Sequence, residues 1–249
     1  MTDPTLIRRI EELSLNAWPA AQTLLDDGWV LRFGNGYTRR ANAIYPLYAG
    51  NRELEEKLCA CEALYASQGQ PTIFKVTEAS QPTGLDAALA ARGYQTDAQT
   101  GVQLLDLRPV EWTPPRDVTL SETLDADWLS AYARMSGLVK AEKLAHEKIL
   151  TAILPARRFA AIRVEGEIVA CGMAVVQDGW VGFYDIRTDP AFRRQGHAYG
   201  VMVALLAWAK SAGALDAYLQ VMLNNPPALN LYARLGFQQA YHYWYRAKA

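Results

Sequence analysis

The chain has 249 residues, of which 51% are hydrophobic and 20% charged, and its formal net charge is −1. This apolar fraction is enough for a packed core and excludes a largely disordered chain. The length allows one large domain or two of ordinary size. Proteins that hold nucleic acid or an anionic membrane surface need an excess of basic residues, which this chain lacks. We therefore expect neither nucleic acid nor membrane as a partner.

Two further features concern location and metals. The longest nearly apolar run, residues 198–209, is too short to span a bilayer. The charged first residues lack the apolar region of a signal peptide. The cysteines Cys59, Cys61 and Cys171 are odd in number and lack the spacing of metal ligands. We interpret them as reduced thiols, and we expect a cytoplasmic protein without a metal site.

The first half of the chain mixes helical and extended patterns. Residues 6–25 have apolar positions at helical spacing, interrupted at Pro19. After them we expect, in order, a hairpin over 28–47 around Gly34-Asn35-Gly36, a helix over 53–67, a strand over 71–76, a short helix over 85–92 ended by Gly93, and a strand over 94–107.

The composition of a linker marks the middle of the chain: residues 108–116 contain three prolines among charged residues. We place a domain boundary there, with one domain over residues 1–108 and a second over residues 117–249. The second half is expected to contain strands over 117–121, 158–164, 168–177, 180–188, 216–223 and 237–247, and helices over 125–136, 140–153, 194–212 and 227–235. This order predicts an α/β or α+β fold, a mixed and mostly antiparallel sheet flanked by helices.

The two halves resemble each other. In both, a short helix ends in a glycine followed by an aromatic residue: residues 89–94 read LAARGY, and residues 232–237 read YARLGF. This similarity between the two segments indicates an internal duplication. The first half lacks a turn rich in arginine and glycine, and Leu89 stands where the second half has Tyr232.

The turn before the predicted helix over 194–212 has the features of an anion site. The first N–H groups of a helix lack internal partners and carry partial positive charge, so a phosphate fits there. Gly196 and Ala198 leave the backbone accessible, and Arg193 and Arg194 add countercharge. The spacing fits neither a Walker loop nor a dinucleotide fingerprint. A solvated surface turn is the alternative interpretation.

A second motif follows the next strand. Asn225 and two prolines open a helix that carries Tyr232 and ends at Gly236. By itself Tyr232 is as readily explained as a half-buried aromatic residue. Together the two motifs, in this order and spacing, resemble the GNAT superfamily of acyl-CoA-dependent N-acetyltransferases over residues 117–247. The first half resembles a second, degraded copy of that fold, in which we expect no cofactor.

The resemblance implies roles for particular residues. Backbone amides of the turn would bind the pyrophosphate of acetyl-CoA, the end of the preceding strand would pair with the pantetheine arm, Asn225 would lie close to that arm, and Tyr232 would protonate the leaving thiolate. The implied binding residues are Ile186, Arg187, Thr188, Arg193, Arg194, Gln195, Gly196, His197, Ala198, Asn225 and Tyr232.

The general base is open at this point. Some relatives carry a glutamate where this chain has Gln220, which cannot take a proton. Asp185 is the nearest carboxylate candidate, with a structural ion pair as its alternative. A water chain or an already neutral amine would need no base. We interpret His197 as a packing or phosphate-contacting residue, and His146 and His242 as surface or packing residues.

The resemblance predicts a monomeric or homodimeric enzyme that transfers an acetyl group to a small-molecule or amino-acid-like amine. The first half can serve acceptor selection through Arg39 or Arg40, or present a solvated strand face there. Acetylation of a protein N-terminus or lysine is the alternative acceptor class. A CoA-ligand sensor without catalysis is the alternative from another class.

Overall fold

A computed structural model describes residues 2–248. The chain divides into two compact units, one formed by Met1–Gly101 with Tyr241–Ala249 and the other by Val102–Ala240. The division falls before the proline-rich stretch at 108–116, and the end of the chain returns to the first unit. The functions assigned above to the two expected domains, 1–108 and 117–249, stay predictions. Within residues 2–248, no helix combines the length and the apolar character that crossing a bilayer requires.

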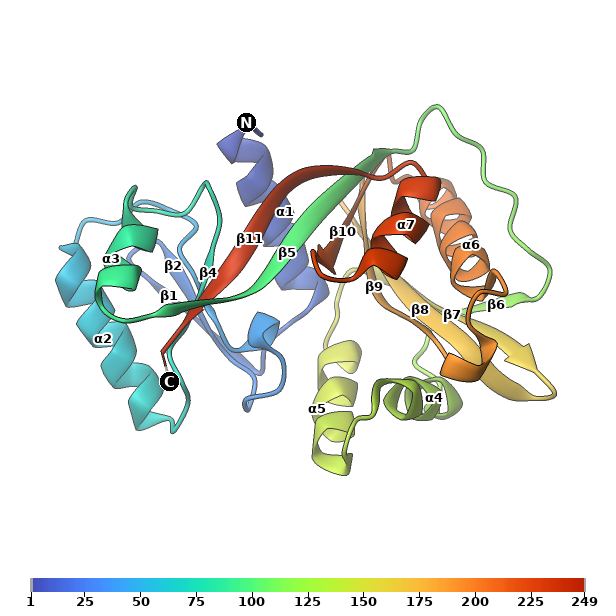
Figure 1. Cartoon of the computed structure of the whole chain (residues 1–249), viewed down its shortest axis with the longest axis horizontal. Helices are drawn as coiled ribbons and strands as arrows, with labels where there is room; N and C mark the ends of the chain where they lie inside the picture. The colour runs from blue at the N-terminus through green and yellow to red at the C-terminus, as the bar shows by residue number, and fades with distance from the viewer. Residues whose placement is uncertain (1, 249) are drawn as a thin grey trace. The chain divides into compact units, whose positions relative to one another are not determined.

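The first unit is a sheet with helices around it (Figure 1). Its strands run in the order β1-β2-β3-β4-β11, and β3 and β4 are the parallel pair. The elements are α1 (Pro4–Ala17), β1 (Gln22–Asp26), β2 (Trp29–Phe33), β3 (Ile44–Tyr45), α2 (Leu54–Ser67), β4 (Ile73–Val76), α3 (Leu85–Ala91), the start of β5 (Gln95–Asp106) and the end of β11 (Gln238–Ala247). A core of buried residues that includes Trp29, Phe74 and Leu89 lies between α2, α3 and the sheet.

A strand that was not predicted precedes the predicted hairpin. The helix at the start of the chain ends at Ala17, and residues 22–26 form β1, which pairs with β2. Asp27 and Gly28 make the connection with φ of 44° and 86°, the positive values that a tight two-residue hairpin turn requires. The expected hairpin over residues 28–47 is present, because β2 pairs antiparallel with β3, but its second strand is only Ile44–Tyr45. The helical prediction over residues 6–25 is wrong beyond Ala17, where β1 replaces the helix.

The second unit has the strand order β5-β10-β9-β8-β7-β6. The pairs β6–β7, β7–β8 and β8–β9 are antiparallel, and β10 is parallel to β9. The elements are β6 (Val118–Ser121), α4 (Ala126–Ser136), α5 (Lys140–Thr151), β7 (Ala156–Val164), β8 (Glu167–Gln177), β9 (Trp180–Thr188), the 3-10 turn η2 (Pro190–Phe192), α6 (His197–Ser211), β10 (Asp216–Met222) and α7 (Pro226–Arg234). The predicted fold class, a mixed and mostly antiparallel sheet flanked by helices, is confirmed.

Alternate residues of the central strands face different helices. Ala160 and Ile162 of β7 belong to one core with residues of α6 such as Val201. Phe159, the residue before Ala160, meets Trp128 of α4, with ring centroids 5.2 Å apart. Successive strand residues point to opposite faces of a sheet, so α6 and α4 cover opposite faces, as Figure 1 also shows.

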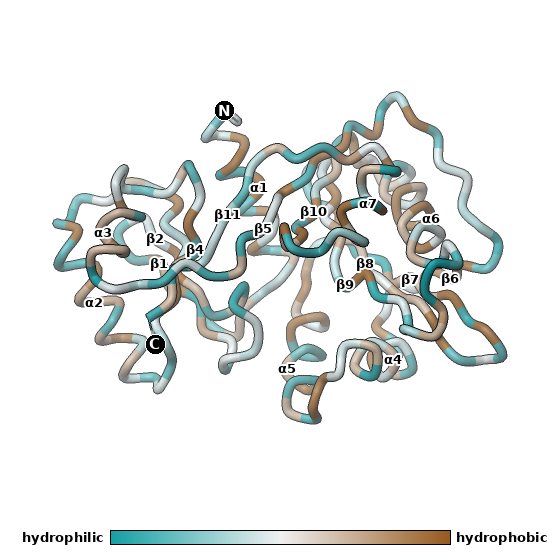
Figure 2. The backbone as a smooth tube through the Cα atoms, in the orientation of Figure 1, coloured by the Kyte–Doolittle hydropathy of each residue, from teal (hydrophilic) through white to brown (hydrophobic). Residues whose placement is uncertain are grey.

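The connection between β5 and β6 is attached to the second unit. It carries mostly hydrophilic residues (Figure 2), as the linker interpretation expected. However, the ammonium of Lys210 on α6 donates to the carbonyls of Arg108 and Val110 and pairs with Glu111, and Trp112 packs against the core. This segment therefore follows α6 and belongs to the surroundings of that helix.

Candidate functional site

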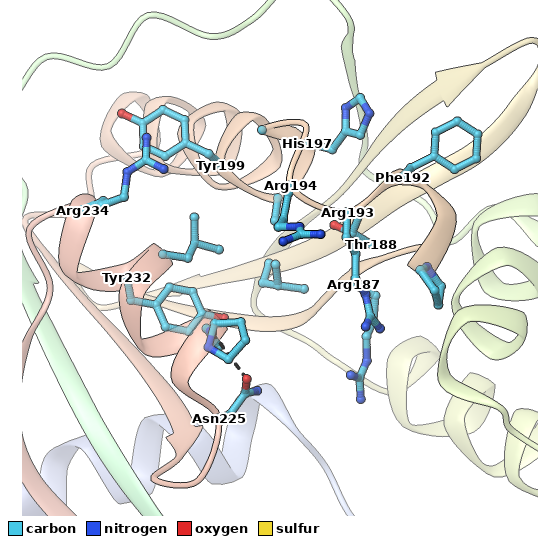
Figure 3. A pocket seen from close by; sticks show the side chains of 17 residues that line it. Arg187, Thr188, Phe192, Arg193, Arg194, His197, Tyr199, Asn225, Tyr232 and Arg234 are labelled. Atoms are coloured by element: carbon cyan, nitrogen blue, oxygen red, sulfur yellow. Dashed lines mark hydrogen bonds between the residues drawn. The ribbon is translucent and has the colours of Figure 1, made fainter.

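A cavity of about 680 Å³ lies where β9 ends and α6 and α7 begin. Its walls come from the end of β9, from η2, from the first residues of α6 and from α7 (Figure 3). Ten of the residues implicated by the sequence line it: Ile186, Arg187, Thr188, Arg193, Arg194, Gly196, His197, Ala198, Asn225 and Tyr232. Gln195 and Asp185 are not among its lining residues.

The start of α6 opens into this cavity. Gly196 precedes the helix with φ of 88°, and no side chain caps the first turn. A Cβ atom added at Gly196 would meet nothing within 4 Å, so the space before the first N–H groups is open. Arg194 also has a positive φ, 61°, which turns the chain so that the helix mouth faces the cavity. The first turn contains no acidic residue that would repel an anion.

The cavity is strongly cationic. Arg187, Arg193, Arg194 and Arg234 line it, and no lining residue is acidic. Within residues 2–248 none of these four guanidinium groups has a carboxylate within ion-pair distance; the nearby Asp189 is paired with Arg134 of α4. Asp189 also accepts the N–H of Ala191 and so fixes η2. Four arginines without acidic partners suit a ligand that carries several negative charges.

The sequence did not single out the far end of the cavity. Tyr199 on α6 and Arg234 on α7 lie close together there (Figure 3), with the guanidinium carbon 5.4 Å from the ring centroid. Tyr199 is three residues after Gly196, and Arg234 is three residues after Leu231, which also lines the cavity, so helical spacing from the recognised motifs was the available indication. An exposed aromatic ring beside a cation is a surface on which a flat, charged group can stack.

Tyr232 is held against the wall by α7. Asn225 caps that helix by accepting the N–H of Ala228, at 3.4 Å, and two prolines occupy its first turn. The ring of Tyr232 packs edge-on against Phe237, 6.1 Å between centroids, and the residue is 8% exposed. Burial raises the pKa of the Tyr232 hydroxyl to about 12, although the charge of Arg187 opposes the shift. The phenol therefore stays protonated near neutral pH.

The last residues of β9 present an open backbone edge. Pairing of β9 with β10 ends at Phe183, opposite Leu219. The pairing with β8 continues to Thr188 but shifts register between Cys171 and Met173. At this bulge Asp185 adopts a φ of 57°. Ile186–Thr188 therefore keep their partners on one side only, and the other side borders the cavity.

The bulge interrupts the regular alternation of side chains along β9, and the neighbours Tyr184 and Asp185 contact different elements. Tyr184 contacts Tyr218 of β10, hydroxyl to hydroxyl at 2.8 Å. The carboxylate of Asp185 lies 3.1 Å from Nε2 of His146 on α5, and their side chains are 3% and 0% exposed. His146 is thus a buried packing residue and not a surface one. Nothing local in the sequence indicated this pair, because its members come from different elements far apart in the chain.

Comparisons with known proteins agree on one family. The family described as "Probable histone acetyltransferase Rv0428c C-terminal" matches residues 5–246. The "Uncharacterized N-acetyltransferase YobR" of Bacillus subtilis (strain 168) is 28% identical over 249 residues, covering 97% of this chain and 98% of that protein.

Solved structures share the fold. A GCN5-related N-acetyltransferase from Kribbella flavida superposes with a TM-score of 0.71 at 17% identity, covering 100% of this chain and 96% of that one. A tandem GNAT protein from the clavulanic acid biosynthesis pathway gives 0.63 at 13% identity, covering 96% and 87%. The chain belongs to the family of the Rv0428c C-terminal region and is an N-acetyltransferase of the GNAT type with a tandem GNAT-like fold.

Proposed function

We propose that this protein transfers an acetyl group from acetyl-CoA to the amine of a small-molecule or amino-acid-like acceptor. The observation that carries the proposal is the cavity itself, in which four arginines without acidic partners and an uncapped helix start lie beside the buried phenol of Tyr232. Coenzyme A carries a diphosphate and a third phosphate, so its charge matches this lining.

The residues present fit a coenzyme A thioester. The N–H groups at the start of α6, with Arg193 and Arg194, would hold the diphosphate. The open edge of Ile186–Thr188 would pair with the amide groups of the pantetheine arm, as an added strand does. Two polar atoms of lining residues, Oγ1 of Thr188 and Nε2 of His197, are buried without a hydrogen-bond partner within residues 2–248, and a polar ligand can satisfy them.

The reaction requires three proton transfers. An acceptor amine with a pKa of about 10.4 is protonated near pH 7, so it must lose one proton before its nitrogen attacks the thioester carbon. As the C–N bond forms and the C–S bond breaks, the phenol of Tyr232 donates its proton to the departing sulfur. The second proton of the attacking nitrogen then restores the phenol. We assign the first proton to Asp185, whose carboxylate lies at the bulge just before Ile186.

Acetylation of a protein N-terminus or lysine is the second candidate. The family description, which names a probable histone acetyltransferase, favours it. The net charge of −1 favours neither acceptor class. A CoA-ligand sensor without catalysis is a third reading, against which the presence of Tyr232 in the cavity weighs.

The test is release of free thiol from acetyl-CoA over a panel of acceptors. The panel combines amino acids, small primary amines, peptides with a free N-terminus and a basic histone-tail peptide, and mass spectrometry identifies the acetylated product. We expect saturable turnover with at least one small amine. Turnover confined to peptides would contradict a small-molecule acceptor and favour acetylation of proteins. Binding of acetyl-CoA with no turnover on any acceptor would favour the sensor.

A further inference from the structure

Asp185 and His146 form a buried pair. The transfer chemistry described above gives a role to Asp185 but none to His146. Their side chains are 3% and 0% exposed, and Oδ2 of Asp185 lies 3.1 Å from Nε2 of His146. This same oxygen makes no hydrogen bond of regular geometry within residues 2–248, so the pair is defined by its short distance and its burial. A buried carboxylate is costly unless it is paired, so the contact with His146 is what makes Asp185 tolerable at this position.

The imidazole ring is held by a column of aromatic side chains. Tyr132 of α4 stacks on His146 with centroids 4.4 Å apart and planes at 9°. Trp128 stacks on Tyr132 at 7°, and the indole N–H of Trp128 donates to the carbonyl of Ala160 on β7, at 2.9 Å. The column thus fixes the orientation of His146 relative to the sheet, and a fixed imidazole ring can hold a neighbouring carboxylate in one orientation.

The backbone at Asp185 is also unusual. Its φ of 57° is rare for a residue with a side chain, and such conformations persist where the surroundings enforce them. The next three residues, Ile186–Thr188, line the cavity. The carboxylate therefore stands at the point where β9 separates from β10.

We propose that His146 is a positioning residue that holds the carboxylate of Asp185 as the acceptor for the proton lost by the substrate ammonium. This inference rests on the proposed acetyl transfer. The N–H bond of the ammonium breaks, its electron pair stays on nitrogen for the attack, and the proton passes to the carboxylate of Asp185. After turnover the carboxylate releases this proton to solvent, which accounts for the one proton that the overall reaction produces.

Other charged and titratable groups surround the pair. Arg187 on β9, Arg134 on α4 and the thiol of Cys171 on β8 are close enough to interact electrostatically with this region, and burial near Asp185 raises the pKa of that thiol. The phenol of Tyr132 lies against the imidazole. Both arginines keep their charge across the range in which an amine substrate titrates, so a change in the pH profile on mutation of His146 reports on the pair.

Three variants test the inference: His146→Gln, Asp185→Asn and Asp185→Gly. Glycine adopts positive φ without strain, so Asp185→Gly keeps the bulge while it removes the carboxylate. For an alkyl amine at pH 7 we expect kcat/KM to fall roughly 10²-fold in both Asp185 variants and about tenfold in His146→Gln, with affinity for CoA unchanged. The deficit should shrink at high pH, and also for acceptors whose amines are already neutral at pH 7.

The outcomes separate this inference from the proposed function. A wild-type protein without turnover on any amine overturns both. Wild-type turnover retained in Asp185→Gly overturns the role of the pair while acetyl transfer stands. An equal loss at every pH and for every amine shows that the pair is structural only, and it also overturns the inference. Circular dichroism and CoA affinity show whether each variant is folded. If His146→Gln does not fold, Asp185→Gly still tests the role of the carboxylate.

Discussion

The short helices α3 and α7 end in the same way in the two units but carry different side chains. In α3 the N–H of Gly93 donates to Ala90 and that of Tyr94 to Leu89; in α7 the N–H of Gly236 donates to Ala233 and that of Phe237 to Tyr232. The two glycines have φ of 88° and 94°. At the matching position Leu89 is fully buried in the first core, whereas Tyr232 borders the cavity of the second unit. The two helix ends share one backbone conformation, and the side chain at the matching position, Leu89 or Tyr232, differs in chemistry.

The starts of α2 and α6 differ in charge. Helix α2 follows Glu53 and has Glu55 and Glu56 in its first turn, whereas α6 has no acid there and follows Arg193 and Arg194. Acidic side chains satisfy the positive end of a helix and repel a bound anion. An open helix start is thus a site for phosphate only where the sequence keeps carboxylates away from it.

Several charged side chains of the first unit are paired with one another. Lys75 and Glu11, each with a side chain 1% exposed, form a buried ion pair, and Tyr241 donates to the same carboxylate at 2.9 Å. Arg92 pairs with Glu55 and Glu62. These charges stabilise structure, in contrast to the four arginines that line the cavity of the second unit. Four experiments can break or sharpen this contrast.

The largest effect is expected for Tyr232→Phe. Loss of the phenolic proton should lower kcat by roughly 10²–10⁴-fold and change the KM for acetyl-CoA only a few-fold. Because the pKa of Tyr232 is raised to about 12, the phenol keeps its proton below that pH, and ionisation of this group should cause no loss of wild-type activity up to about pH 10. Steady-state kinetics over pH measure both. Tyr94→Phe, which removes a hydrogen bond to Glu62, is the matched control, and wild-type kcat in Tyr232→Phe would remove the phenol from the mechanism.

Glu11→Gln tests the buried charges of the first unit. Removing one partner of a buried ion pair leaves the other charge uncompensated, so we expect the free energy of unfolding to fall by about 3–5 kcal/mol. The double variant Glu11→Gln with Lys75→Met should recover part of this loss. Denaturant unfolding measures the stability of each variant. An unchanged stability of Glu11→Gln would contradict the structural role of this pair.

Arg193→Gln combined with Arg194→Gln tests the cationic mouth of α6. Charge-assisted hydrogen bonds contribute about 1.5–3 kcal/mol, and solvent exposure reduces this, so we expect the KM for acetyl-CoA to rise about tenfold with kcat little changed. The dependence of KM on salt should weaken as well. Arg92→Gln removes an arginine that has acidic partners and should leave KM unaltered. If both variants behave alike, the contrast between the two units is mistaken.

Gly196→Ala and Gly93→Ala form the closest matched pair. Both glycines have φ of 88° and open space at the Cβ position, so alanine should cost each about 1–2 kcal/mol of stability. Only at Gly196 does the added methyl group point into the space proposed for the diphosphate. We therefore expect a few-fold rise in the KM for acetyl-CoA for Gly196→Ala alone, measured beside thermal unfolding of both variants.

The sequence by itself determined the features that are written locally. Gly93 and Gly236 predicted the ends of α3 and α7, because positive φ at a helix end strongly favours glycine. Arg193, Arg194 and Gly196 predicted an anion site at the start of α6, and Asn225 with its prolines predicted the start of α7. These patterns lie within a few residues of one another, so backbone geometry alone brings their atoms together.

Only the tertiary structure decided which distant side chains meet. The contact between His146 and Asp185 depends on the register shift in β8 and β9, which turns Asp185 towards α5. Tyr199 meets Arg234 because α6 and α7 pack on a common core. No local pattern encodes these contacts, because a shift of one residue in strand pairing moves every following side chain to the other face of the sheet.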